Sequence, residues 1–405
     1  MKLSRLHVFA AIACGVALAV DMIEMAIGNA FSTVFIAAPY HMPSTQLSLL
    51  LASVYLGAVV GAPLFGWMAG RAGIRRCLAV ALVWIALASF LAAATPEISW
   101  LGALRFLAGL PLGAVPPLLI AYLTRMAPPQ RRGFLIFWVC GLAALAPPIA
   151  LMTIRWLLPL QPLGIASWRW PLAGAGVLAL AAGWFFTRLP EADSWQASAN
   201  QVGDVDSTTA DRLASVRHHA GRLAFVSAIY FLFPWASVGF PLLTGPILLL
   251  RGFDVRQALL YVALTTTGPT LASLVTGVFV DRLERRTTLA VCAAVMVAMV
   301  AVFAFARSPP WVGSALVVFG IAAAVYITAL TMYAAEVFPA KIMTFTTSFA
   351  WSCNRGASVL VPIVLLALIT PQDSLDSLLP VGIALLVSLL LVCCGPRGAA
   401  GRTLD

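Results

Sequence analysis

The chain is dominated by apolar stretches that are each long enough to cross a lipid bilayer as a helix. A spanning helix needs roughly 20 apolar residues. Hydrophobic residues make up 61% of the 405 residues and charged residues only 10%, whereas a soluble domain carries about 25% charged residues. No soluble fold of this length can bury so much apolar surface, so we predict an all-α membrane protein. The twelve predicted spans are 8–37, 47–69, 76–95, 99–123, 133–158, 169–188, 223–250, 257–280, 287–306, 311–335, 342–369 and 375–395.

One polar segment divides these stretches into two groups of six. Residues 189–222 are rich in Asp, Ser, Thr, Ala and His and have no apolar period, which is typical of a flexible linker. We therefore predict an N-terminal six-helix bundle over residues 1–188, a cytoplasmic linker over 189–222, and a C-terminal six-helix bundle with a short cytoplasmic tail over 223–405.

Two short loops repeat one another in the two groups. In each loop a glycine is followed four residues later by a small or acidic residue, then by an arginine, and then by a basic pair. The two loops are 211 positions apart, close to half of the chain, which indicates a duplicated membrane unit. The residues concerned are Gly66, Gly70, Arg71, Arg75 and Arg76 in the first loop and Gly277, Asp281, Arg282, Arg285 and Arg286 in the second.

The distribution of basic residues sets the predicted orientation. An even number of spans places both termini on one side of the membrane. Of the 25 Lys and Arg residues, 18 fall on that side and five on the opposite side, and Arg105 and Arg355 lie within spans. Since cytoplasmic loops carry the excess of positive charge, we expect both termini in the cytoplasm and the chain in the cytoplasmic (inner) membrane. The net charge of +10 forms no single patch, so we expect no nucleic-acid partner.

Further motifs accompany the repeated loops in a fixed order along the chain. Together with the six-plus-six arrangement, this ordered set resembles the major facilitator superfamily of secondary transporters. The resemblance implies twelve transmembrane helices in two six-helix halves, alternating access, a small-molecule substrate, a monomer, no cofactor and no enzymatic activity. The motifs are Arg105 with Gly109 and Gly113, Ser167–Pro171 followed by Leu189–Glu191, Arg251–Phe253, and Tyr333–Pro339.

The first span carries the motif that distinguishes a subgroup. Asp21-Met22-Ile23-Glu24 followed by Gly28 is similar to the DGxD…G of proton-coupled transporters of aromatic acids and other metabolites. Met22 replaces the expected Gly, Glu24 replaces the second Asp, and the spacing to Gly28 is one residue short. The resemblance implies proton-coupled symport.

Asp21 and Glu24 are the candidate proton-coupling residues. They lie near the middle of the first span, and their spacing of three places them on one helix face. A carboxylate at this depth is costly unless it is paired, hydrated or protonated, so such a pair is suited to take up and release a proton. The alternative is that one or both only form hydrogen bonds to neighbouring helices.

Arg105 and Arg355 are the candidate substrate-binding cations. A guanidinium group stays charged, so within the membrane it must face a cavity or an anion. A guanidinium in a central cavity binds a carboxylate through two parallel hydrogen bonds. The alternative for each is an ion pair with Asp21 or Glu24 that does not touch substrate.

Four further polar or amphipathic side chains are weaker candidates for substrate binding. Tyr230 and Trp235 belong to an aromatic cluster next to Pro234 in the seventh span, and Asn29 and Asn354 are polar residues within spans. The aromatic rings are suited to stack on a planar solute, but aromatic residues also serve ordinary helix packing.

The repeated loops are the candidate gating elements. Ion pairs among basic loop residues and nearby acids can hold the cytoplasmic side shut and must break when it opens. Gly70 and Arg125 stand where the N-terminal half would carry acids, so we expect a weaker charge network in that half. The gating candidates are Gly66, Arg71, Arg75, Arg76, Asp281, Arg282, Arg285, Arg286 and Glu336.

The chain lacks the motifs of several other classes of membrane protein, which leaves transport as the predicted function. No histidine lies in the middle of a span, no metal site is expected, and the phosphate-binding GxxxxGK[ST] pattern is absent. We therefore predict a proton-coupled symporter of a small organic acid, aromatic or not. The alternative is a proton-driven efflux antiporter for drugs or organic cations, although Gly141–Ile149 lacks the Gly-rich run common in such antiporters.

Overall fold

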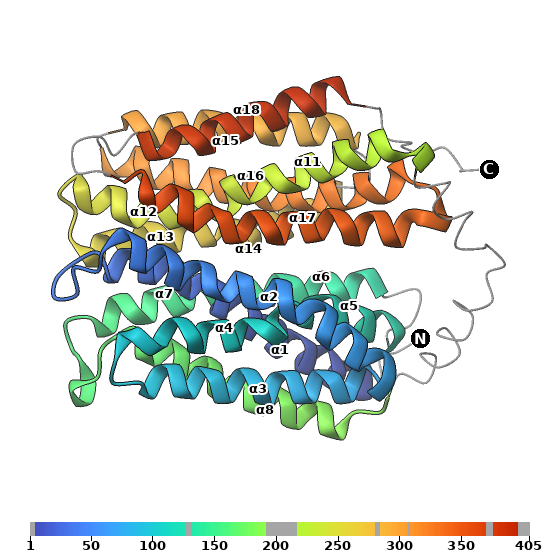
Figure 1. Cartoon of the computed structure of the whole chain (residues 1–405), viewed down its shortest axis with the longest axis horizontal. Helices are drawn as coiled ribbons and strands as arrows, with labels where there is room; N and C mark the ends of the chain where they lie inside the picture. Colours follow the sequence, from blue (N-terminus) through green and yellow to red (C-terminus); the bar gives the residue numbers. More distant parts are fainter. Residues whose placement is uncertain are drawn as a thin grey trace.

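The protein is a bundle of long, roughly parallel helices. The computed structural model describes residues 5–126, 132–191, 217–279, 284–306, 308–369 and 376–395, and the regular secondary structure of these ranges is entirely helical. Figure 1 shows the helices of the first half of the chain stacked against those of the second half.

In the first half, helices α2 and α4 pack closely together, as do α3 and α8, while α1 contacts α5, α6, α7 and α8. The helices are α1 (Arg5–Val34), α2 (Ser44–Ala72), α3 (Ile74–Ala94), α4 (Leu101–Leu112), α5 (Val115–Met126), α6 (Arg132–Ala143), α7 (Ala146–Leu157) and α8 (Arg169–Arg188).

In the second half, α15 packs against α16 and α18, and α11 packs against α17 and α18. The helices are α11 (Ala220–Ser237), α12 (Gly239–Leu250), α13 (Val255–Thr266), α14 (Gly268–Phe279), α15 (Arg285–Phe305), α16 (Pro309–Val337), α17 (Ala340–Ala367) and α18 (Leu379–Cys394).

Eleven helical segments of the described residues are long and apolar enough to cross a membrane. The remaining predicted span, 257–280, is divided at Thr267 into α13 and α14, each of which is 12 residues long. Proline explains such breaks, because it lacks the N–H that a helix needs and its ring clashes with the preceding turn. Pro269 follows this break, and Pro147 follows the break between α6 and α7. The predicted all-α architecture is therefore confirmed, with several spans built from two consecutive helices.

Of the predicted linker, residues 192–216 lie outside the described residues, and α11 already begins within its last part at Ala220. Helix α8 ends at Arg188 as predicted. Helix α1 begins and α18 ends at the same end of the bundle (Figure 1). We call this the terminal end, and it also holds the first repeated loop and Arg286 of the second, which contacts the end of α18.

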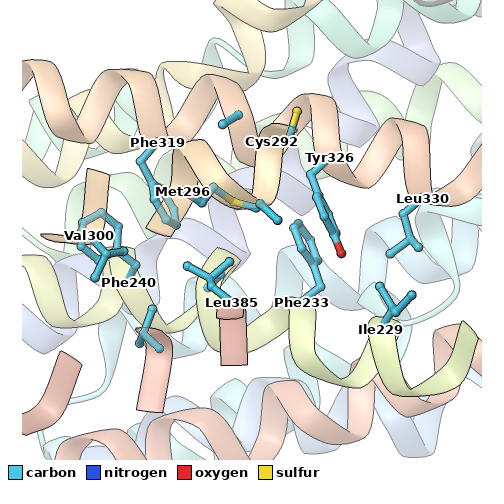
Figure 2. Close-up of a cluster of buried hydrophobic side chains, with 14 of the residues drawn as sticks. Ile229, Phe233, Phe240, Cys292, Met296, Val300, Phe319, Tyr326, Leu330 and Leu385 are labelled. Atoms are coloured by element: carbon cyan, nitrogen blue, oxygen red, sulfur yellow. The ribbon is translucent and has the colours of Figure 1, made fainter. Parts of the chain in front are cut away.

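Each half has its own buried core. In the second half, Phe233 of α11 stacks on Tyr326 of α16 with ring centroids 5.3 Å apart, and the Tyr326 hydroxyl is hydrogen-bonded to Ser388 of α18 at 2.6 Å. Figure 2 shows these rings among the aliphatic side chains of α11, α15 and α16. Phe319 belongs to this core and also reaches the central cavity described below.

Four glycines bring α2 and α4 into backbone contact. Gly57 and Gly61 on α2 face Gly109 on α4 and Gly113 directly after it, and a Cβ atom at any of the four would collide with a backbone carbonyl of the opposite segment. Small residues at a spacing of four allow membrane helices this close approach. The contact fixes the position of α4 and therefore of Arg105, one turn before Gly109.

We expect Gly61→Leu to break this contact, because the new side chain can only fit if the two helices separate. The overpacking should lower the free energy of unfolding by about 3 kcal/mol, measured as thermal stability of the full chain in detergent. The control is Gly102→Leu on α4, where a Cβ atom meets open space. Equal stability of the two variants would contradict this account of the α2–α4 contact.

Candidate functional site

A central cavity of about 370 Å³ lies between the two halves. Its wall comes from α1 and α2 and the α6–α7 junction on one side, and from α11–α14, α16 and α17 on the other. The lining is largely apolar, with methionine, proline and phenylalanine side chains beside a few polar groups. A concave, mostly apolar cavity with few polar groups is the usual form of a small-molecule site. The polar and charged side chains of the lining include Asp21, Asn29, Tyr55, Asn354 and Arg355.

Asp21 lines this cavity and is 7% exposed. Its Oδ1 atom has no hydrogen-bond partner among the described residues. Arg355 of α17 lines the same cavity and lies close enough for its positive charge to act on the Asp21 carboxyl group. The structure therefore places one acid from the first half and one base from the second half around a shared space.

Glu24 faces away from the cavity and is completely buried. Its carboxylate forms an ion pair with the Arg105 guanidinium of α4 and accepts a hydrogen bond of 2.6 Å from the Ser89 hydroxyl of α3. Arg105, which is 2% exposed, also donates to the Glu24 carbonyl oxygen. Glu24 and Arg105 thus adopt the ion pair that was the alternative to direct substrate contact.

The spacing of Asp21 and Glu24 suggested that the two carboxyl groups share one environment. In the structure their environments differ, because Asp21 lines the cavity and Glu24 is paired with Arg105. Three residues of an α-helix turn the side chain by about 300°, which leaves the two carboxyls about 60° apart around the axis. That angle is enough to direct Asp21 into the cavity and Glu24 toward α3 and α4.

Asn354, Arg355 and Trp351 form the α17 wall of the cavity. The Asn354 side chain donates to the carbonyl oxygen of Tyr230 at 3.0 Å, and the Trp351 ring packs edge-on against the Tyr230 ring at 5.5 Å. Tyr230 itself is completely buried behind this wall. Tyr230 and Trp235, the two aromatic candidates from the sequence, lie outside the cavity lining, and Trp235 packs against the core of the second half.

Trp351 and Tyr55 are two aromatic residues of the cavity lining that the sequence did not single out. Trp351 precedes Arg355 by four residues, so the ring and the guanidinium lie on one face of α17. Asn29, by contrast, was a sequence candidate and does line the cavity. The signal for Trp351 was available, because its spacing to an intramembrane arginine is visible in the sequence, whereas Tyr55 has no such neighbour on α2.

The first repeated loop is joined to the end of α8. The Glu191 carboxylate forms an ion pair with Arg75 at 3.3 Å and accepts from the Arg75 backbone N–H at 2.9 Å. The Arg75 guanidinium also donates to the carbonyl oxygens of Thr187 and Leu189. Glu191 therefore supplies the N-terminal half with an acid that the sequence-based network did not include.

The second loop is joined to its own half in a similar way. Arg285 forms an ion pair with Glu336 of α16 at 3.2 Å. Arg286, the counterpart of Arg75, donates to the carbonyl oxygens of Val392 and Cys393 at the end of α18. In both halves an arginine of the loop thus caps the carboxyl end of the last helix, where a cation is stabilised by the helix dipole.

The other gating candidates form no ion pair that would indicate a gating role in the described part of the chain. The Arg71 guanidinium lies 4.1 Å from the centre of the Trp67 ring, and Arg76 is exposed at the start of α3. A Cβ atom at Gly66 would meet open space. Asp281 and Arg282 lie outside the described residues.

The two halves also contact one another directly, through α1 and α12 and through a shared apolar cluster. The Ser32 hydroxyl of α1 donates to the Leu242 carbonyl of α12 at 2.9 Å. Phe31, Leu242 and Leu366 belong to one buried apolar cluster drawn from both halves. Further out, Arg155 donates to the carbonyl oxygen of Arg256 at 3.1 Å.

Comparison with known proteins gives a consistent result. The family model of the Major Facilitator Superfamily matches residues 13–362. The chain is 22% identical to "Putative metabolite transport protein YyaJ" of Bacillus subtilis, and the alignment covers 98% of this chain and 94% of that protein. It is 27% identical to an arabinose-proton symporter of the same organism, over 42% of this chain and 37% of that protein.

The fold is also that of a solved transporter structure. The xylose transporter XylE from E. coli, in a partially occluded inward-open conformation, superimposes with a TM-score of 0.77 at 15% identity, covering 99% of this chain and 100% of that chain. Two six-helix halves around a central cavity, the repeated loops and the family match over residues 13–362 agree. The chain therefore belongs to the major facilitator superfamily and is a multi-pass membrane transporter.

Proposed function

We propose that the protein is a proton-coupled symporter that carries a small organic acid, aromatic or not, across the cytoplasmic membrane by alternating access. The observation that carries this proposal is the placement of Asp21 and Arg355 around one cavity, one from each half of the chain.

Arg355 is the proposed partner of the substrate carboxylate. It lines the cavity and has no ion pair or hydrogen bond within the described part of the chain. A guanidinium binds a carboxylate with two parallel hydrogen bonds, and the low dielectric of the cavity strengthens that contact. Trp351, one turn away, offers a ring face to the rest of a planar acid.

Asp21 is the proposed proton carrier, because its carboxyl faces the cavity while Glu24 is held by Arg105 and Ser89. When Asp21 is ionised, the charge of Arg355 is partly balanced by it. When Asp21 is protonated, Arg355 is left to bind an anion. Proton and acid then enter together, since each makes the site more favourable for the other.

The contacts at the two ends of the bundle are the proposed gates. The α1–α12 contact at Ser32 and Leu242 would close one side, and the loop ion pairs Arg75–Glu191 and Arg285–Glu336 would stabilise the halves at the terminal end. Both termini would face the cytoplasm, as the positive-inside rule indicates.

The test is uptake into proteoliposomes with a pH-sensitive dye inside. The panel contains four acids (benzoate, nicotinate, lactate and succinate), the sugars arabinose and xylose, and the organic cation tetraethylammonium. Symport of an acid predicts that at least one acid acidifies the lumen. Acidification by sugars alone would overturn the organic-acid substrate, and outward proton movement with the cation alone would favour the antiporter.

Arg355→Gln should raise the KM for the transported acid about a hundredfold, because an amide cannot neutralise a carboxylate and loses about 3 kcal/mol of a charge-assisted contact. Initial rates over a range of acid concentrations measure this. Arg188→Gln, which alters an exposed arginine at the end of α8 and outside the cavity, is the matched control. An unchanged KM in Arg355→Gln would remove Arg355 from the site.

A further inference from the structure

The lining of the central cavity carries one basic and one carboxylic side chain. Of the described residues that form it, Arg355 is the only basic one and Asp21 the only one with a carboxyl group. When Asp21 is protonated, the wall therefore carries a single positive charge. One carboxylate of a solute balances that charge, whereas a second carboxylate would stay unpaired at low dielectric, which is costly. The charge of the wall thus favours a monoanion over a dianion.

Four polar side chains of the lining already donate hydrogen bonds within the protein. The hydroxyls of Thr265, Thr266 and Ser358 donate to carbonyl oxygens of their own helices at 3.1, 2.8 and 2.9 Å. The Asn354 side chain donates to the Tyr230 carbonyl oxygen at 3.0 Å. A solute with many hydroxyl groups needs a partner for each of them, and every buried hydroxyl left unpaired costs free energy. The lining is therefore poorly suited to a polyol.

The rest of the lining is largely apolar and comes from both halves of the chain. Methionine side chains are flexible and adapt to the shape of an apolar ligand. A dry cavity of about 150 Å³ holds a benzene molecule, so a cavity of about 370 Å³ has room for a six-membered ring together with a carboxylate. The apolar lining includes Met22, Met25, Pro147, Val238, Phe319 and Ile327.

Charged and apolar surfaces also follow one another along α17. Trp351 precedes Arg355 by four residues, which places both side chains on one helix face, and both line the cavity. Four residues correspond to a rise of about 6 Å. An acid with a single ring is long enough to reach both side chains, with its carboxylate at Arg355 and its ring toward Trp351.

We propose that the cavity binds a monocarboxylate whose body is apolar and about the size of one six-membered ring. It discriminates against dicarboxylates through its single positive charge and against polyhydroxylated solutes through its apolar lining. The inference rests on the proposed function and narrows the substrate of that same site to this chemical class.

The test compares three acids that share one ring. Cyclohexanecarboxylate has one carboxylate on an apolar ring, cyclohexane-1,4-dicarboxylate adds a second carboxylate, and quinate adds hydroxyl groups. Isothermal titration of the purified full chain in detergent, near neutral pH where all three acids are ionised, gives the Kd of each. We expect the dicarboxylate to bind about a hundredfold more weakly than cyclohexanecarboxylate, and quinate about tenfold more weakly.

Met25→Gln tests the apolar wall, because glutamine has nearly the length of methionine and adds an amide. It should weaken the binding of cyclohexanecarboxylate and strengthen that of quinate, so that the ratio of the two Kd values shifts about tenfold toward quinate. Met299→Gln is the matched control, since Met299 is a half-buried methionine of α15 outside the cavity. Its ratio should equal that of the wild type.

Equal affinity for the three acids, or tighter binding of the dicarboxylate or of quinate, would overturn the inference and leave proton-coupled transport of an acid intact. An unchanged ratio in folded Met25→Gln would also overturn it. If Met25→Gln does not fold, the three wild-type Kd values decide. If none of the three acids binds, the inference is wrong, and proteoliposome uptake of lactate and succinate then decides separately whether the proposed function holds.

Discussion

Asp21→Asn is expected to abolish acid-driven proton uptake, with a loss of at least about a hundredfold in net flux. The side chain keeps its shape but can neither bind nor release a proton. It also removes the negative charge that balances Arg355 across the cavity. Exchange of labelled acid should therefore continue, and its dependence on pH should disappear. Proton flux and exchange, measured on the same proteoliposomes, check both expectations.

Asp21→Glu is the matched variant, since it retains a carboxyl group in a cavity of about 370 Å³. It should recover part of the net uptake. Glu24→Gln provides the opposite check. If Glu24→Gln is well folded and abolishes proton uptake while Asp21→Asn leaves it intact, the Glu24–Arg105 pair is the carrier and the assignment of Asp21 is wrong.

Glu24→Gln is expected to cause the largest loss of stability, because it leaves the buried Arg105 guanidinium without its counter-ion. Breaking one partner of a buried ion pair typically lowers stability by about 3–5 kcal/mol. Thermal unfolding of the detergent-solubilised full chain, compared at equal protein concentration, measures the change.

The double variant Glu24→Leu with Arg105→Leu separates a charge effect from a packing effect. Removing both charges eliminates the unpaired ion, so we expect the double variant to be more stable than Glu24→Gln. The two single variants for comparison are Glu24→Leu and Arg105→Leu. If the double variant loses as much stability as these two variants lose together, the ion pair itself is not the source of the stability.

The architecture was predictable because the bilayer imposes a simple length requirement on apolar segments. The predicted span 169–188 coincides with α8, and 257–280 is recovered as α13 and α14. The span lengths did not predict that some spans are divided into two helices. That division depends on where proline frees backbone groups and on whether neighbouring helices provide hydrogen-bond partners for them.

The site was predictable only in part. An intramembrane charge is conspicuous in a sequence, which is why Asp21 and Arg355 could be named as candidates. The partner of such a charge depends on helix rotation and packing, so the pairing of Glu24 with Arg105 required the structure. Tyr55 resembles an ordinary span residue, and only its position on the cavity wall distinguishes it.

The loops illustrate a further limit. A missing acid at Gly70 suggested a weaker charge network in the N-terminal half, but Glu191 reaches Arg75 from the end of α8. The two residues are 116 positions apart, and a pattern confined to one loop cannot include such a contact.

The most direct test of the central claim is proton movement in liposomes that contain the wild-type chain and experience no gradient except that of an added acid. The account predicts that benzoate, nicotinate, lactate or succinate acidifies the lumen, and that Asp21→Asn abolishes the signal while Arg188→Gln retains it. A lumen whose pH is unaffected by every acid, in protein that still exchanges one of them, would contradict proton-coupled symport.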